Sequence, residues 1–266
     1  SGGSERTNYY MSLGYTEQEG VSLSNEMSRY TFRSNADHEI RDWLNIGVNG
    51  GVTRTEYDGL NTGGNSLSGN MFSAIRQHPN VPIYNPDHPT GYNIGYQGSD
   101  GTWLSQYLVS TWDNNAQIGD NLPNWMYALD HNKFTSEITR IIGNVYADIS
   151  PVEFLNFRTQ VNVDNANTNG FLYYSPVHGD GQGSNGRVQN TNAELIRWNW
   201  QNILSYNDSF GEDHNVGLVL ISEYQKQRNK SFFGTGTDLS NDFFSHNLIS
   251  NSFGVPGAGG SLTENG

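Results

Sequence analysis

The sequence lacks cysteine altogether, and this absence excludes a disulfide framework and any thiolate metal site. Charged residues are scarce at 15%, whereas soluble domains carry about 25%. Basic residues are the scarcer sign, with 14 Lys and Arg against 27 Asp and Glu, so we expect no nucleic acid as a partner. No run approaches the ~20 apolar residues that a membrane-spanning helix requires.

Glycine and aromatic residues are plentiful by contrast. The chain has 31 Gly and 15 Tyr, and 12% of its residues are aromatic. A composition low in apolar and charged residues but rich in these types indicates many turns and half-buried strands. The aromatic content argues against disorder, which is the competing interpretation of low hydrophobicity.

The two ends of the sequence look like interior segments of a longer chain. Residues 1–4 lack an initiator methionine and a basic, apolar leader, and residues 263–266 have the composition of a loop. We therefore expect the chain to be a fragment.

Apolar and polar residues alternate with a period of two in seven segments, which predicts strands. The clearest alternation runs from Leu155 to Asp164, with Val161 and Val163 on one face and Asn162 on the other. The seven predicted strands lie at about residues 8–15, 29–38, 44–53, 136–149, 155–164, 196–207 and 216–224. Their length suits tilted strands that cross a membrane better than the usual strands of about 5–6 residues.

The predicted connections alternate between short and long. Short turns are expected at residues 38–43, 150–151 and 209–214. The connections after the first, third and fifth predicted strands are longer, at about 10, about 80 and about 30 residues. This alternation places all short turns at one end, as in membrane β-barrels with short periplasmic turns and long extracellular loops. A soluble β-sandwich or jelly roll stays open as an alternative.

Four sequence blocks, in order along the chain, resemble the SusC/RagA family of TonB-dependent outer-membrane transporters. The first is residues 1–20, SGGSERTNYYMSLGYTEQEG. The others are the hairpin at residues 29–44, the segment PNVPIYNPD at residues 79–87, and the strand pair at residues 140–164. The resemblance implies an all-β fold, in which residues 1–266 form a transmembrane wall segment of one larger, plugged barrel of about 22 strands.

The resemblance also implies a function. A protein of this family imports an oligosaccharide or peptide across the outer membrane of a Gram-negative, Bacteroidetes-type bacterium. TonB would act through a plug segment and TonB box that this sequence does not contain, and a SusD-like surface lipoprotein would cover the extracellular mouth. We expect outer-membrane lipid around the barrel, no enzymatic activity and no cofactor. Alternative hypotheses are a siderophore or cobalamin receptor, and a secreted, lectin-like β-sandwich that binds carbohydrate.

The long connection at residues 56–133, predicted to be extracellular, is the main candidate for substrate binding. Aromatic rings interleaved with amides and carboxylates suit the capture of sugars or peptides, because stacking supplies contact area and hydrogen bonds supply orientation. The competing interpretation is that these rings pack the loop onto itself. The candidate residues are Tyr84, Tyr92, Tyr96, Trp103, Tyr107 and Trp112.

Other conspicuous residues receive structural interpretations. Trp198 and Trp200 are expected in an aromatic girdle at the lipid interface. The seven histidines lack metal-site spacing, so no metal is expected. The segment at residues 180–186 is interpreted as a Gly-rich surface loop, and no catalytic constellation is found.

Overall fold

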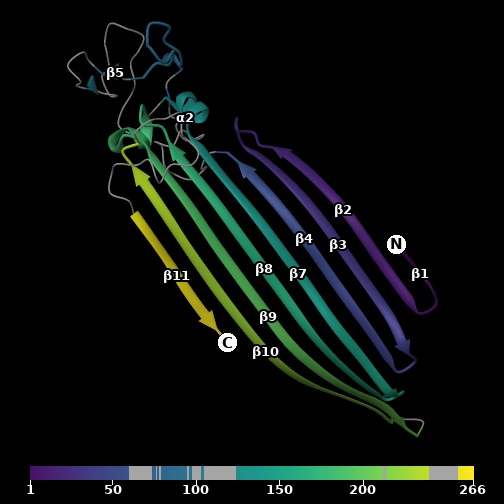
Figure 1. The fold of residues 1–266 in the computed structure, drawn as a ribbon. Coiled ribbons are helices and arrows are strands. Elements are labelled where there is room, and N and C mark those ends of the chain that lie inside the picture. The colour runs from purple at the N-terminus through teal and green to yellow at the C-terminus, as the bar shows by residue number, and fades with distance from the viewer. Residues whose placement is uncertain are drawn as a thin grey trace.

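The main element of the computed structural model is one long antiparallel sheet whose neighbouring strands follow the order of the chain. The structure describes residues 1–59, 74–75, 77, 79–94, 96–97, 103–104, 124–211, 214–239 and 257–266. The strands of the sheet are β1 (Gly2–Gly3), β2 (Thr7–Glu19), β3 (Glu26–Arg41), β4 (Leu44–Asp58), β7 (Lys133–Val152), β8 (Leu155–Tyr174), β9 (Arg187–Phe210), β10 (His214–Thr237) and β11 (Gly257–Asn265). Figure 1 shows them side by side as a single layer.

All seven predicted strands are confirmed, and each is longer than the alternating pattern indicated. Strand β8 continues ten residues beyond Asp164 to Tyr174. In this extension Asn165, Asn167 and Asn169 occupy the face that carries Val161 and Val163 lower in the strand. Both faces are polar there, so hydrophobic alternation stops although the hydrogen-bonded ladder continues. The connection after β8 is therefore residues 175–186, much shorter than predicted.

The prediction that the chain ends in a loop is wrong, because the last residues form β11. This strand pairs with β10 from Gly257 opposite Thr235 to Asn265 opposite Gln227. Its first half is rich in glycine, a residue with low strand propensity, so the sequence did not predict a strand there. At Gly259 a Cβ atom would lie 2.7 Å from the Phe233 ring, so a larger residue there would require that ring to move.

Tight turns lie at one end of the sheet and the longer connections at the other. The turns are Asp42–Trp43 and Glu153–Phe154, and the short connection between Phe210 of β9 and His214 of β10 lies at the same end. The opposite end carries the α-helix α2 (Trp125–His131) and the 3₁₀ helix η2 (Gly179–Ser184), which Figure 1 shows together above the strands. The predicted asymmetry of connections is confirmed. The separate pair β5 (Tyr96–Gln97) and β6 (Trp103–Leu104) belongs to the longest connection.

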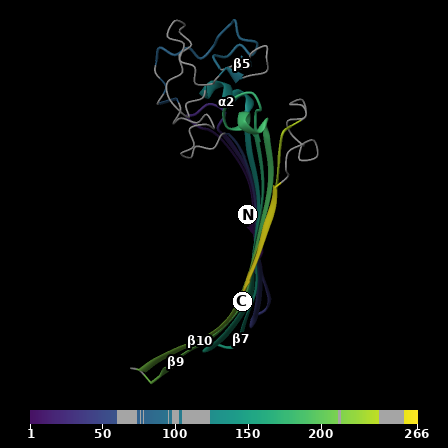
Figure 2. The same cartoon turned by 90° about the vertical axis from the view of Figure 1, so that its left-hand side faces the viewer.

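A β-sandwich would need a second sheet packed on the first, and the described strands other than β5 and β6 form one layer. Figure 2 shows this layer edge-on as a curved sheet. The buried hydrophobic residues are few and gather at the loop end, in and beside α2, the ends of β8 and β9, and Leu239. The body of the sheet therefore has no core of its own, and the sandwich alternative is wrong. No helix in the described ranges is long and apolar enough to cross a membrane.

The apolar residues of the sheet form a band that slants across the register. Tyr9 of β2, Val161 of β8 and Tyr224 of β10 lie in one row of paired residues. From this row the apolar stretch of β2 runs toward the loops, to Tyr15, whereas that of β10 runs toward the turns, to Val216. The shift is roughly one residue per strand, as expected for strands tilted about 35–45° to a barrel axis.

Candidate functional site

The sheet has two chemically different faces. We call the face that carries Val48, Val145 and Val161 the apolar face, and the face that carries Asn49, Asn144 and Asn162 the polar face. Val145 is 58% exposed and Val161 is 43% exposed, although both are apolar. The amides on the other side are half-buried among their neighbours. This is the arrangement of a barrel wall whose outer side contacts lipid and whose inner side contacts water.

A row of side-chain amides crosses the polar face. Asn35, Asn49, Asn144, Asn162 and Asn199 are consecutive register partners on β3, β4, β7, β8 and β9. The Asn49 amide donates to the Asn144 carbonyl at 3.4 Å, and the Asn144 amide donates to the Asn162 carbonyl at 2.6 Å. Because each amide both donates and accepts, the row offers hydrogen bonds of both kinds along its length.

This amide row lines a shallow groove of about 490 Å³. Gly51 also lines the groove on the polar face, where the absence of a side chain lets another backbone approach closely. Arg33, Arg197 and Asp164 add charges of both signs to its lining. The groove therefore combines hydrogen-bonding amides with apolar contact area, to which Ile142 contributes.

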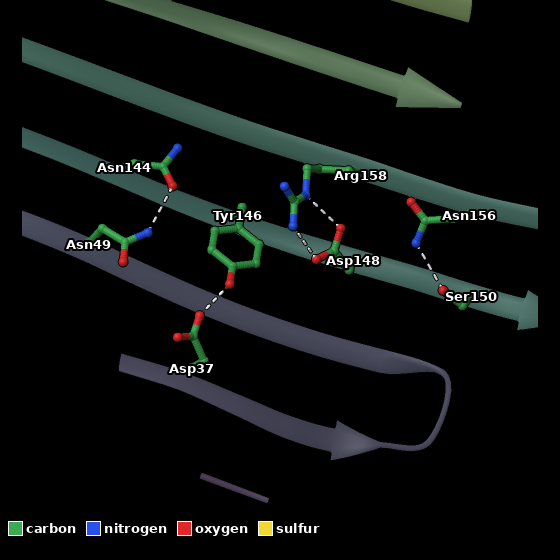
Figure 3. Close-up of polar contacts among 8 residues, drawn as sticks. All are labelled: Asp37, Asn49, Asn144, Tyr146, Asp148, Ser150, Asn156 and Arg158. Atoms are coloured by element: carbon green, nitrogen blue, oxygen red, sulfur yellow. Dashed lines mark hydrogen bonds and ion pairs between the residues drawn. The ribbon is translucent and has the colours of Figure 1, made fainter. Parts of the chain in front are cut away.

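A charged cluster lies on the polar face nearer to the tight turns (Figure 3). Arg158 donates two hydrogen bonds to Asp148, at 2.7 and 2.6 Å, and its guanidinium lies 4.6 Å from the centre of the Tyr146 ring. The Tyr146 hydroxyl donates to Asp37 on β3. Gly47 lies between them in the register, and any side chain there would collide with the Tyr146 ring. The cluster fixes the orientation of three charged groups on the inner surface.

At the loop end, parts of two connections pack into one unit, which we call the loop cap: residues 79–94, 124–132 and 175–186. Asn124 precedes α2, and its side-chain carbonyl accepts from the Tyr127 backbone N–H at 3.1 Å. The Tyr127 hydroxyl lies 2.9 Å from the Ser175 hydroxyl, and the backbone N–H of Ser175 donates to the Asn132 side chain at 2.9 Å. These bonds tie the longest connection to the one that follows β8.

The centre of the loop cap is aromatic. The Tyr127 ring is 2% exposed, stacks on His131 with ring centres 4.0 Å apart, and meets the His178 ring edge-on at 5.6 Å. Tyr92 packs edge-on against Tyr127 at 5.2 Å, and its hydroxyl donates to Asp130. That hydrogen bond to a carboxylate raises the pKa of Tyr92 to about 12. Tyr92 therefore stays protonated and acts as a packed, hydrogen-bonded member of the cap.

The structure describes four of the six aromatic residues that were predicted to bind substrate. Tyr84 and Tyr92 lie together, with ring centres 5.4 Å apart, and Tyr84 is 56% exposed. The Tyr84 ring is thus accessible, whereas Tyr92 packs the loop onto itself. Tyr96 and Trp103 belong to the paired segments β5 and β6. The remaining two candidates, Tyr107 and Trp112, lie outside the described residues, so their proposed role stays a prediction.

Sequence reasoning did not single out the amide row or His178. Register pairing of the predicted hairpins could have aligned Asn144 with Asn162, because they lie on adjacent strands joined by a tight turn. No comparable local signal points to His178. Its partner Asn124 is 54 residues away in sequence and meets it only in the folded loop cap.

A hollow of about 650 Å³ opens on the polar face close to the loop cap. Its lining includes Arg29, Tyr57, Phe134, Leu172 and Gln189, so apolar and polar groups alternate around it. This mixture of contact area and a few oriented polar groups is typical of a binding surface for a polar organic ligand. Within the described part of the chain, no group of three or more His, Asp or Glu could hold a metal ion.

His178 makes the loop cap sensitive to pH. The side chain is 1% exposed, and its Nε2 accepts from the Asn124 backbone N–H at 2.8 Å. Nδ1 has no hydrogen-bond partner among the described residues. Burial, together with the nearby His88, lowers the pKa of His178 to about 4. The neutral ring is therefore the form that the folded cap requires.

We expect the loop cap to loosen in mild acid. An unfolded His178 has a pKa near 6.5, so the stability it contributes is present above about pH 6.5 and is lost as the pH falls toward 4, by up to about 3 kcal/mol. The sensitivity of residues 79–132 to protease should rise as the pH is lowered from 7 to 4.5. His178→Gln, which can accept the same hydrogen bond but does not titrate, should flatten the profile. An unchanged profile in this variant would assign the pH response to another group.

Comparisons with known proteins agree with this architecture. No protein-family model matches the chain. Two curated proteins of Formosa agariphila, TonB-dependent receptor P26 and TonB-dependent receptor P3, are each 28% identical to it over 256 and 257 residues. The alignments cover 95% and 93% of this chain but only 23% of each relative. The chain thus spans about a quarter of the length of these proteins.

Solved structures show the same fold. The RagAB peptide importer in its closed-closed state matches with a TM-score of 0.70 and 21% identity, over 98% of this chain and 28% of the solved chain. The structure described as the RagAB peptide transporter matches equally well, over 99% of this chain and 28% of the other. The predicted resemblance to TonB-dependent receptors of the SusC/RagA type is confirmed.

Proposed function

Since the chain has the fold of a barrel wall from a TonB-dependent receptor of the SusC/RagA type, we propose that it serves in the import of an oligosaccharide or peptide across the outer membrane. In this proposal residues 1–266 form part of one transmembrane barrel domain, the apolar face contacts lipid and the polar face lines the lumen. The protein moves its substrate without changing it chemically, so it is a transporter and not an enzyme.

The observation that carries the proposal is the opposite chemistry of the two faces along the apolar band of the sheet. A soluble protein rarely leaves so large an apolar surface uncovered. Here the apolar band crosses seven strands and slants with their tilt, as a lipid-facing band must. Trp198 and Trp200 lie within this face, and we keep the prediction that they contribute to an aromatic girdle.

The loop cap and the hollow beside it form the entry side of the proposed path. Tyr84 has an exposed ring in the cap, and the hollow opens at the loop end of the polar face. A substrate would pass from the aromatic groups of residues 56–133, the extracellular loop, toward the amide row. Oligosaccharides and peptides both carry the hydroxyl or amide groups that such a row can hydrogen-bond.

Partners follow from the same proposal. A SusD-like surface lipoprotein would cover the loop end, and TonB would supply energy through a plug segment outside this sequence. The two RagAB structures are a peptide importer and a peptide transporter, and the shared fold supports a transport role for this chain. No nucleic acid is expected, given the net charge of −13.

The proposal is tested by the sidedness of a single strand. Because these 266 residues contain no cysteine, Gly183→Cys and Glu153→Cys would each place a new thiol beyond one end of β8 in the full-length protein. A membrane-impermeant maleimide should label position 183 in intact cells and position 153 only after lysis. Labelling at 153 alone would invert the topology, and equal labelling of a soluble, secreted product would refute the membrane barrel.

Transport itself needs a separate measurement. Loss of the full-length gene should abolish growth on the imported oligosaccharide or peptide, and both cysteine variants should restore it, since their positions lie outside the lumen. Unchanged uptake in the gene-deleted strain would refute the transport assignment while leaving the topology intact.

A further inference from the structure

A second hollow lies on the apolar-face side of the sheet, where the apolar band ends and the strands continue toward the loops. On β7 the sequence of that face changes from Ile141 through Thr139 to Glu137, and on β8 from Val163 to Asn169. The hollow has a volume of about 760 Å³. In the proposed membrane orientation it faces outward and extends from the edge of the hydrocarbon into the layer above it.

The floor of this hollow is a continuous register row of polar side chains with an aromatic ring at its end. Glu137, Asn169, Asn192 and Phe232 are consecutive partners on β7, β8, β9 and β10. The Asn192 amide donates to Asn169 at 2.7 Å and to Asn167 at 3.3 Å, so the asparagines hold each other in place. Phe232 is 55% exposed although it is fully apolar.

The charge of the hollow decides which ligand it fits. Its lining contains five carboxylates and no lysine or arginine; the carboxylates are Glu17, Glu26, Glu56, Asp58 and Glu137. Arg54 lies beside two of them and bridges Glu56 and Glu137 at 2.8 and 2.9 Å. A phosphate or another anion would be repelled. Carboxylates instead accept hydrogen bonds from hydroxyl groups, and amides both donate to them and accept from them. Exposed aromatic rings offer apolar faces for stacking.

We propose that this outward hollow binds the saccharide chains of glycolipids in the outer leaflet of the surrounding membrane. The proposal rests on the proposed function, because only a membrane-embedded barrel brings the hollow to the level of lipid headgroups. On β2 the hollow begins at Glu17, directly beyond the last residue of the apolar band, Tyr15, which favours a membrane-anchored saccharide over a soluble one. On β10 it extends further from the membrane, since Phe232 lies eight residues beyond Tyr224. The binding surface lies on the opposite side of the sheet from the hollow that we assign to imported substrate.

The test uses the full-length protein in detergent and glycolipid purified from the host membrane. One probe is the intact glycolipid, and the other is the same lipid after mild acid hydrolysis has removed its saccharide. Native mass spectrometry should show several-fold higher occupancy by the intact form. Equal occupancy by both forms would overturn the proposal, since the lipid anchor and its phosphates would then account for binding.

A matched pair of variants locates the site. Phe232→Ala should lower occupancy by the intact glycolipid about two- to tenfold, as expected for the loss of one aromatic contact. Phe233→Ala, at the next residue and on the opposite face, should leave it unchanged. Equal effects of the two variants would place the saccharide elsewhere. Both rings are exposed, so neither variant should affect folding.

Two further outcomes are decisive. Saccharide released by the hydrolysis should compete only at concentrations well above those of the glycolipid. If it binds as tightly as the glycolipid, the hollow takes soluble glycans and the assignment to membrane lipid is wrong. Cysteine labelling at position 183 in the same variants separates the two proposals. Normal surface labelling without saccharide preference refutes this inference alone, whereas absence from the membrane refutes the proposed function.

Discussion

Replacing Val161 by arginine in the full-length protein is expected to lower the free energy of unfolding by about 2–4 kcal/mol, if the residue lies near the middle of the bilayer. Val161 lies on the apolar face, is 43% exposed, and shares its register row with the apolar Val145 and Val48. A guanidinium at this position would have to enter hydrocarbon or distort the lipid around it. Denaturant unfolding in lipid vesicles, followed by tryptophan fluorescence, measures the effect.

The matched control is the next residue of the same strand. Asn162→Arg introduces the same side chain on the polar face, among Asn144, Arg197 and other groups of the inner groove. Its cost should be well under half that of Val161→Arg, because the new charge stays in contact with water and polar groups. Equal costs, or a larger cost at Asn162, would show that the inside and outside faces have been exchanged.

The second large effect is expected from Tyr127→Ala in the loop cap. Truncating a buried aromatic side chain costs about 3–5 kcal/mol, and this one also loses its hydrogen bond to Ser175 and its stacking on His131. The loss should appear as local opening, with faster hydrogen exchange in α2 and in residues 175–186. The strands of the sheet should keep their protection, because none of their ladders depends on Tyr127.

Tyr84→Ala is the control for this variant. Tyr84 is also a tyrosine of the cap but is 56% exposed, so its truncation should change local protection by well under about 1 kcal/mol. If Tyr84 binds substrate, uptake should fall in Tyr84→Ala while the cap stays closed. Global unfolding of the barrel in Tyr127→Ala would contradict the view of the cap as a unit separate from the wall.

Most strands could be predicted because their signal is local. In β8 the alternation of Val161, Asn162 and Val163 is a property of three neighbouring residues, and it identifies both the strand and its faces. The signal fails where both faces become polar, as at Asn167, or where glycine dominates, as in β11. In these segments the ladder is maintained by pairing with an adjacent strand, which a single-strand pattern cannot reveal.

The candidate site could be predicted only as a region. The long connection after β4 and its aromatic content were visible in the sequence, but the separate roles of Tyr84 and Tyr92 were not. Tyr92 packs on Tyr127, which follows 35 residues later, and that contact depends on how the connection folds back onto β8. Tyr84 and Tyr92 differ in how much of each ring is exposed to solvent, and this exposure is set by the folding of the loop cap.

The sequence by itself therefore determined the strand faces, the asymmetry of the connections and the resemblance to TonB-dependent receptors. These depend on residue type and spacing along one chain segment. Only the tertiary structure decided the amide row, the slant of the apolar band and the contact of His178 with Asn124. The reason is physical: such features require hydrogen-bonded register between strands, or packing between loops, and both join residues that are far apart in sequence.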